Sequence, residues 1–179
     1  MDEAREQIER ALDAGINWFD TAPLYGEGHA DRVLRDALKG RSERAVIATK
    51  IGVALKGSSG HAESQLDAAH LRSDLEASLR RLDRETLDLV QVHWPCQHGT
   101  PLEETFTTLQ ELKNEGKVRH IGVCNYGPEA LDELTNYADV VSLQTPYSLL
   151  RRELARGGVP TEVIEGQDSY TPHKSPPIP

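Results

Sequence analysis

The sequence lacks the features that three classes of protein need. It has only two cysteines, Cys96 and Cys124, whose spacing fits neither a metal site nor a disulfide framework, so we expect reduced thiols. No apolar run approaches the roughly 20 residues of a membrane helix. Positive charge is also scarce, because 20 Lys and Arg face 29 Asp and Glu, a net charge of -9. We therefore expect neither nucleic acid nor an anionic membrane as a partner.

The N-terminus and the chain length favour a globular protein with a single core. Residues 1–10 (MDEAREQIER) are charged and helical in pattern, unlike a signal sequence, so the expected location is cytoplasmic. A chain of 179 residues can bury one core, but it is short for a complete eight-unit β/α barrel, which needs about 250 residues. The oligomeric state stays open.

What the sequence does contain is a regular alternation of helix and strand patterns. Apolar residues recur at helical spacing in five segments: 2–14, 30–38, 67–82, 101–116 and 128–134. Short apolar runs that predict strands follow or separate them: 16–19, 45–49, 87–92, 120–124 and 139–143. Five such alternations predict an α/β fold with a parallel sheet and helical crossovers.

Three local features of the sequence predict details of this fold. Residues 52–65 are rich in Gly, Ser and His, which predicts a long mobile loop. Residues 100–103 (TPLE) match a capping box with Thr100 as the N-cap of the next helix. The pair Arg80 and Arg81 is expected on the solvated surface.

Polar side chains stand where each predicted strand ends. They are Asp20, Lys50, His93, Asn125 and Gln144. Tyr25 follows the first of them in a loop bounded by Pro23 and Gly26. An aspartate before Thr-Ala-Pro is by itself more often a turn or a helix cap than a catalytic group. Because parallel crossovers place all strand C-termini on one face, however, five successive polar strand ends favour a functional site.

An aspartate, a tyrosine, a lysine and a histidine at one rim suit the delivery of a proton to a carbonyl oxygen. The Lys50 ammonium would stabilise the phenolate form of Tyr25. Asp20 would supply the counter-charge that a buried lysine needs. His93 could orient the carbonyl oxygen or share the proton with the tyrosine.

Such a group supplies no electrons, so the reduction also requires a hydride donor. Protein side chains cannot provide a hydride, and the interpretation therefore demands a nicotinamide or a similar cofactor. Asn125 and Gln144 carry side-chain amides at neighbouring strand ends, and these can pair with the carboxamide of a nicotinamide ring.

Five stretches of the chain match the motifs of a known family, in the same order and with similar spacing. They are GINWFDTAPLYG, VIATK, LDLVQVHWP, EGKVRHIGVCN and VVSLQTPYSLL. On these stretches the chain resembles the aldo-keto reductases, which are NADPH-dependent oxidoreductases with a (β/α)8 barrel. The resemblance implies an enzyme that reduces the carbonyl of a small aldehyde or ketone to an alcohol with NADP(H).

The resemblance also implies roles for individual residues. The catalytic tetrad would consist of Asp20, Tyr25, Lys50 and His93, with Tyr25 as the proton donor. The cofactor-binding residues would be Cys124, Asn125 and Gln144, and no metal is implied. Cys124 stands where the family usually has serine, and a thiol is the weaker hydrogen-bond donor. Asp31 and Arg35 replace the family's usual Glu and Gly, for which we expect adjusted packing.

The resemblance covers residues 3–152 and lacks the terminal strands of the family, so we expect a chain truncated at both ends. Residues 1–152 are predicted to form part of a TIM (β/α)8 barrel with about five to six parallel strands. Residues 153–179, rich in Gly and Pro, are predicted to form a divergent, disordered tail.

Two other functions stay open from the sequence. A truncated remnant could bind a cofactor or a partner without catalysis. A different barrel enzyme could use Asp20 and His93 as metal ligands, but this needs a third ligand at a strand end, where Lys50 stands instead.

Overall fold

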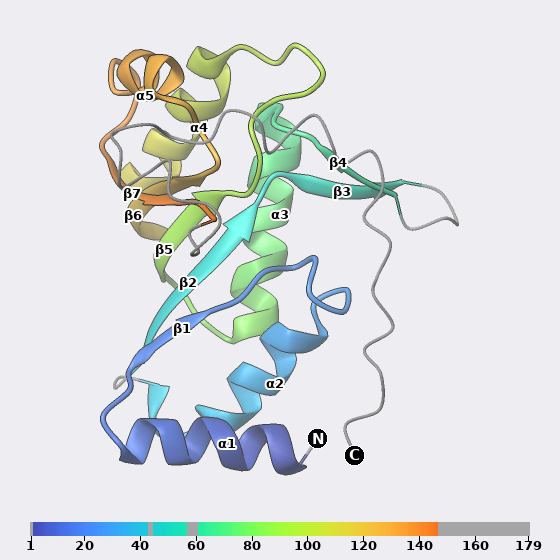
Figure 1. Cartoon of the computed structure of the whole chain (residues 1–179), viewed down its shortest axis with the longest axis vertical. Coiled ribbons are helices and arrows are strands. Elements are labelled where there is room, and N and C mark those ends of the chain that lie inside the picture. Colours follow the sequence, from blue (N-terminus) through green and yellow to red (C-terminus); the bar gives the residue numbers. More distant parts are fainter. Residues whose placement is uncertain (1, 43–44, 57–60, 147–179) are drawn as a thin grey trace.

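The computed structural model describes residues 2–42, 45–56 and 61–146 (Figure 1). The helices are α1 (Asp2–Asp13), α2 (His29–Ala37), α3 (Ala68–Leu82), α4 (Leu102–Asn114) and α5 (Pro128–Leu134). The strands are β1 (Trp18–Asp20), β2 (Val46–Ile51), β3 (Val53–Lys56), β4 (His61–Ser64), β5 (Leu87–Val92), β6 (Val118–Cys124) and β7 (Val140–Gln144). Among the helices of these ranges, none is both long and apolar enough to cross a bilayer. The predicted tail, residues 153–179, lies outside the described residues.

Five strands form one parallel sheet in the order β1-β2-β5-β6-β7. A helix lies between consecutive strands of this order along the chain, which is the connection that parallel neighbours require. The sheet curls as part of a barrel does, with its strands fanned across Figure 1. The predicted α/β fold, a partial barrel of parallel strands, is therefore confirmed.

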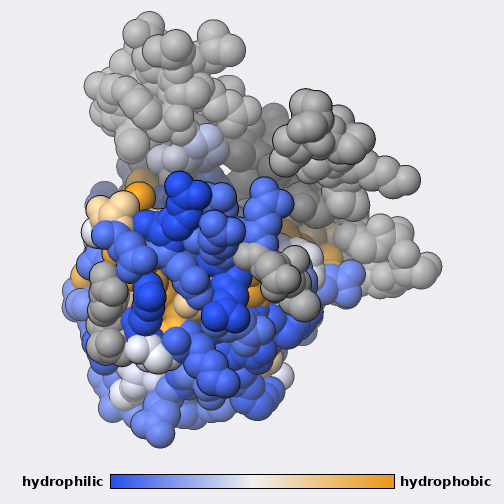
Figure 2. Space-filling model, turned by 90° about the horizontal axis from the view of Figure 1, so that it is seen from below, coloured by the Kyte–Doolittle hydropathy of each residue, from blue (hydrophilic) through white to orange (hydrophobic). Residues whose placement is uncertain are grey.

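One face of this sheet packs on the helices and forms the core. Residues of β2, β5 and β6 join residues of the helices in one buried cluster, which includes Ile47, Val90, Ile121, Leu75 and Phe106. The apolar faces of the helices contribute to this buried cluster. Seen from below, the described surface is largely hydrophilic, with hydrophobic residues showing only in places (Figure 2).

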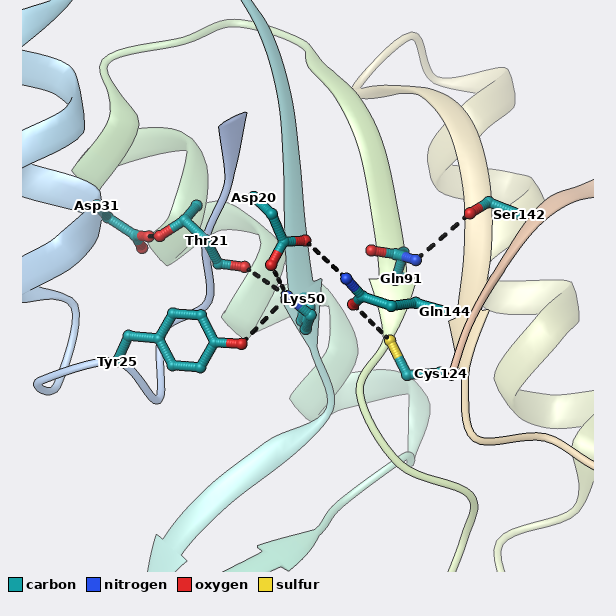
Figure 3. Close-up of polar contacts among 9 residues, drawn as sticks. All are labelled: Asp20, Thr21, Tyr25, Asp31, Lys50, Gln91, Cys124, Ser142 and Gln144. Carbon is teal, nitrogen blue, oxygen red and sulfur yellow. Dashed lines mark hydrogen bonds and ion pairs between the residues drawn. The ribbon is translucent and has the colours of Figure 1, made fainter. Parts of the chain in front are cut away.

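The residues between these core positions point to the opposite face, because side chains alternate along a strand. Lys50, Gln91, Gly122 and Ser142 form one row of this kind across four strands. Gln91 donates from Nε2 to Ser142 Oγ at 3.4 Å, across the strand between them (Figure 3). A Cβ at Gly122 would lie 2.9 Å from Gln91 Cγ and 3.0 Å from Ser142 Cβ. The missing side chain at Gly122 therefore permits the contact.

The prediction of a mobile loop over residues 52–65 was wrong for the part that the structure describes. There β3 and β4 pair as an antiparallel hairpin, with Val53 opposite Ser64 and Leu55 opposite Ala62. Side-chain contacts attach the hairpin to the chain after β5, since Ser64 Oγ accepts from the Gln97 N–H at 2.9 Å. The composition suggested too little apolar area for an element, but backbone pairing and attachment to the neighbouring loop replace a core of its own.

The predicted capping box is also wrong. Helix α4 begins after Pro101, which occupies the N-cap position without a side-chain hydrogen bond. The Thr100 N–H instead donates to Cys96 Sγ at 3.0 Å. Glu104 accepts from the Ala68 N–H at 3.1 Å, at the start of α3. The helix was predicted correctly, but its first turn is held by contacts to other segments.

Candidate active site

The predicted site residues lie at the carboxyl edge of the sheet. Asp20 and Gln144 end β1 and β7, Lys50 is the last residue but one of β2, and His93 and Asn125 directly follow β5 and β6. Backbone hydrogen bonds extend the pairing beyond the strands, since the Asn125 N–H donates to Gln144 O at 2.9 Å. The parallel pairing thus brings together residues that are far apart in the sequence.

Lys50 is the centre of the arrangement (Figure 3). Its buried ammonium donates to Asp20 Oδ2 at 2.6 Å, to the Thr21 carbonyl oxygen at 3.1 Å and to Tyr25 OH at 3.4 Å. An ammonium has three N–H donors, and three acceptors surround this one. The carboxylate and the two oxygens therefore compensate the charge that burial would otherwise make costly.

Tyr25 is carried by the turn between β1 and α2. The turn closes through a hydrogen bond from the Gly28 N–H to Pro23 O at 2.7 Å. Gly28 has a φ of +75°, in the left-handed region that glycine adopts without strain. This turn points the Tyr25 hydroxyl at Lys50, while the tyrosine as a whole remains exposed at the edge of the cavity described below.

His93 is buried beside Tyr25. The two rings meet edge to face, with centroids 6.3 Å apart and an interplanar angle of 85°. Burial first, and the Lys50 charge second, lower the pKa of His93 from 6.5 to about 4, with Asp20 acting in the opposite direction. His93 is therefore neutral near pH 7, with one ring N–H donor and one ring acceptor. Trp94 stacks at a tilt against it, with centroids 5.0 Å apart.

Gln144, one of the three residues predicted to bind a cofactor, connects the lysine group to a second one, Cys124. Its Nε2 donates to Asp20 Oδ1 at 3.4 Å, and its Oε1 accepts from Cys124 Sγ at 3.5 Å. Burial raises the pKa of the Cys124 thiol to about 12, so the thiol keeps its proton and remains a donor. Figure 3 shows this chain of contacts running from Tyr25 to Cys124.

These groups surround a cavity of about 280 Å³. Its lining residues are Tyr25, Lys50, His93, Cys124, Asn125, Gln144, Thr145 and Pro146. Asn125 Oδ1 and Thr145 Oγ1 are buried there without a hydrogen-bond partner in the described residues. Asn125 also has a φ of +62°, a conformation that asparagine tolerates better than most residues. Two of the residues that line the cavity thus carry a polar atom whose hydrogen-bonding capacity is unused in the described residues.

Sequence reasoning missed three residues that matter here. Thr145 lines the cavity one position after a strand end, which is the signal that could have identified it. Thr21 contributes its backbone carbonyl, which no side-chain pattern reveals. Arg81 was expected on the solvated surface, and this was wrong. It pairs instead with the fully buried Asp31, because α2 and α3 pack side by side.

A second, larger cavity has a different character. It measures about 440 Å³, lies between the C-terminal ends of α2 and α3, and is lined by Arg35, Arg80 and Arg84 among others. Arg35 and Arg80 stand in the last turns of these helices, where a cation complements the helix dipole. No strand-end residue lines it, and we assign it no ligand.

A metal-dependent site gains no support. In the described ranges, no group of three or more His, Cys, Asp or Glu side chains could hold a metal ion. Asp20, one of the two ligands considered, is bonded to the Lys50 ammonium instead.

Comparison with known proteins places this geometry in context. The sequence model described as "Aldo/keto reductase family" matches residues 1–163. The aldo-keto reductase YhdN of Bacillus subtilis is 37% identical over 157 residues, covering 87% of this chain and 46% of the relative. The chain spans about half the length of the curated relatives it matches.

Solved structures give the same picture. The glycerol dehydrogenase AKR11B4 from Gluconobacter oxydans superposes with a TM-score of 0.80 at 38% identity, over 86% of this chain and 47% of that one. An aldo-keto reductase from Klebsiella pneumoniae, solved in complex with NADPH, gives a TM-score of 0.70 at 31% identity, over 87% of this chain and 53% of that one.

Proposed function

This chain belongs to the aldo/keto reductase family, and from that premise we propose that it reduces aldehyde or ketone carbonyls to alcohols with NADP(H). The observation that carries the proposal is the buried Lys50 ammonium, which contacts the Asp20 carboxylate and the Tyr25 hydroxyl at once. A cation held beside a phenol at the edge of a cavity is suited to proton delivery.

In this proposal Tyr25 is the proton donor. Its hydroxyl would give the proton to the carbonyl oxygen of the substrate, and the Lys50 ammonium at 3.4 Å would stabilise the phenolate that remains. Asp20 holds Lys50 in place and balances its charge. A nicotinamide coenzyme, when bound, would supply the hydride that reaches the carbonyl carbon.

His93 would orient the substrate. Because its pKa is lowered to about 4, it stays neutral and can donate its ring N–H to the carbonyl oxygen without adding a second positive charge beside Lys50. Its edge-to-face position against Tyr25 would bring both donors to the same oxygen.

The cavity side chains fit the amide end of such a coenzyme. Asn125 Oδ1 is a buried acceptor without a partner in the described residues, and it could accept from the carboxamide N–H. Gln144 and Cys124 would complete the cofactor contacts on the neighbouring strands. The thiol makes a weaker contact than a hydroxyl would.

The test is turnover together with binding. We expect purified full chain to oxidise NADPH in the presence of a simple aldehyde, and Tyr25→Phe to lose turnover by about 10²–10⁴-fold while still quenching its fluorescence on NADPH addition. NADH run in parallel determines the coenzyme preference. The matched control is Tyr137→Phe, since Tyr137 packs against the core outside the cavity. Unchanged turnover in Tyr25→Phe would remove Tyr25 from the proposed role.

Binding without turnover is a second candidate, because the chain spans about half the length of its relatives. It predicts that NADPH quenches the fluorescence of the chain, that Asn125→Ala weakens this binding, and that no aldehyde is reduced. Absence of quenching by both NADPH and NADH would exclude both candidates.

A further inference from the structure

A second group of buried charges lies behind the loop that carries Tyr25, away from the cavity. Asp31 of α2 is fully buried, and its two carboxylate oxygens have different partners. Oδ1 accepts from Thr21 Oγ1 at 2.7 Å, a contact drawn in Figure 3, and Oδ2 accepts from Arg81 Nε at 2.9 Å. Thr21 is also the residue whose carbonyl oxygen accepts from Lys50. The contacts therefore run from Arg81 through Asp31 to a ligand of the site lysine.

Arg81 also faces a second acid, Asp74, whose side chain is 11% exposed. Its guanidinium lies 4.0 Å from Asp74 Oδ1, and Asp74 Oδ2 accepts from the Gly52 N–H at 3.0 Å. Gly52 directly follows β2, two residues after Lys50. The pKa of Asp74 is raised from its ordinary value, mainly by burial and also by the Asp31 charge, against the opposing effects of the Gly52 N–H, His70 and Arg81. One cation thus stands between a fully buried and a largely buried carboxylate, each of which contacts a different segment of the site.

The Arg81 side chain also occupies the space next to the end of the Tyr25 loop. A Cβ at Gly28 would lie 2.6 Å from Arg81 Cδ and 3.0 Å from its Nε. Gly28 is the N-cap of α2 and the last residue of the loop. The guanidinium stem therefore lies against the backbone where the loop ends, on the side away from the cavity lining.

A helix-dipole role does not account for this arrangement. Arg80 and Arg81 both stand in the last turn of α3, where any cation is favourable. Only Arg81 turns inward to the buried acid, whereas Arg80 remains exposed. Arg80 is therefore a matched control for the charge at the helix end.

We propose that Arg81 is a positioning residue, which holds the Tyr25 loop and the end of the Lys50 strand in a fixed relation through Asp31 and Asp74. Its effect on proton delivery rests on the function proposed above, but its effect on the two segments does not. Loss of Arg81 should loosen both segments together. Loss of either acid should loosen only its own.

Hydrogen exchange of the full chain, read by mass spectrometry, tests this without any activity. At labelling times too short for global unfolding to contribute, we expect at least about tenfold faster exchange in Arg81→Met in residues 21–28 and in residues 50–53. Asp31→Asn should affect only the first segment, Asp74→Asn only the second, and Arg80→Met neither. Faster exchange spread equally to residues 102–124 would show general destabilisation and overturn the proposal, as would no change in Arg81→Met. If Arg81→Met does not fold, Arg81→Lys replaces it, because lysine keeps the charge but cannot form the same fork of contacts.

Steady-state kinetics then tests the catalytic consequence. We expect Arg81→Met and Asp31→Asn to lower kcat about tenfold with KM values changed less than about twofold, since the cavity lining is intact. Asp31→Glu, which keeps the carboxylate, should restore most of kcat. A wild-type chain without turnover but with the predicted exchange pattern would reject the proposed function and leave the positioning role intact. Unchanged kcat in Arg81→Met would remove the link to catalysis.

Discussion

The Lys50–Asp20 pair at the cavity and the Arg81–Asp31 pair behind it are built in opposite ways. At the cavity the cation is buried and the acid is partly open, with side-chain exposures of 3% for Lys50 and 33% for Asp20. Behind it the acid is buried and the cation is partly open, with 0% for Asp31 and 22% for Arg81. The first arrangement leaves polar groups reachable by a ligand, and the second shields its acid on every side.

This difference determines what each pair should contribute. Removing the partner of a fully buried charge leaves it uncompensated, which is strongly destabilising. Removing the partner of a partly exposed charge allows water to replace it. We therefore expect the cavity pair to matter mainly for activity and the rear pair mainly for stability.

The largest expected effect is on turnover in Lys50→Met. Without the ammonium, nothing stabilises the phenolate at Tyr25, and we expect kcat to fall by about 10²–10⁴-fold. The free energy of unfolding should change by less than about 1 kcal/mol, because the partly exposed Asp20 can be hydrated. Steady-state kinetics and urea denaturation measure the two quantities. Lys39→Met, at an exposed lysine, is the control, and a loss of stability without loss of turnover would reverse the comparison.

The next effect is on stability in Arg81→Met. The buried Asp31 carboxylate would lose its charged partner, and we expect a loss of about 3–5 kcal/mol in the free energy of unfolding. Urea denaturation of this variant beside Arg80→Met gives the difference. Equal values for the two variants would mean that the Asp31 pair contributes nothing beyond charge at a helix end.

A smaller effect is expected from His93, at the cavity, which should make the free energy of unfolding depend on pH. Well above pH 6.5 the imidazole is neutral in both the folded and the unfolded chain. As the pH falls below that value, the unfolded chain takes up a proton that folded His93 accepts only near pH 4, so stability is lost over this interval. The total loss would be about 3 kcal/mol.

His93→Gln should remove this contribution, because glutamine does not titrate. Urea denaturation of both proteins at several pH values between 6.5 and 4 gives the difference in their free energies of unfolding. The contributions of the carboxylic acids, which titrate in both proteins, cancel in this difference. Parallel curves for the two proteins would contradict a buried neutral histidine.

The smallest effect is expected at Cys124. In Cys124→Ser a hydroxyl would donate to Gln144 more strongly than the thiol, and NADPH affinity should rise by about two- to fivefold, in line with a net gain below 1 kcal/mol. Fluorescence titration measures it. Cys96→Ser, outside the cavity lining, is the control. Weaker binding in Cys124→Ser would show that the Gln144 contact does not organise the cavity.

The parallel sheet was predictable because its strands are apolar runs that end in polar residues. Asp20, Lys50, His93, Asn125 and Gln144 could be placed together by topology alone, since parallel strands share one carboxyl edge. Their catalytic and binding roles stay a proposal until the variants are measured.

Other features depend on contacts that no local pattern encodes. The β3–β4 hairpin is held by backbone pairing and by attachment to Gln97, neither of which has an apolar signature. The partners Asp31 and Arg81 are 50 positions apart, and only the packing of α2 on α3 decides that Arg81 rather than Arg80 turns inward. The sequence therefore could not predict which charged side chains pair when they are far apart along the chain.

The absence of a side chain at Gly122 affects the strands on both sides of it. Gly122 lies on β6, two residues before Cys124. Because it has no side chain, Gln91 and Ser142 of the neighbouring strands can form their hydrogen bond across it. Any side chain there would press on Gln91 and on Ser142, whose backbone oxygen lies 3.1 Å from the position of the added Cβ. We therefore expect a larger residue at position 122 to disturb the neighbouring strand ends, which carry His93 and Gln144.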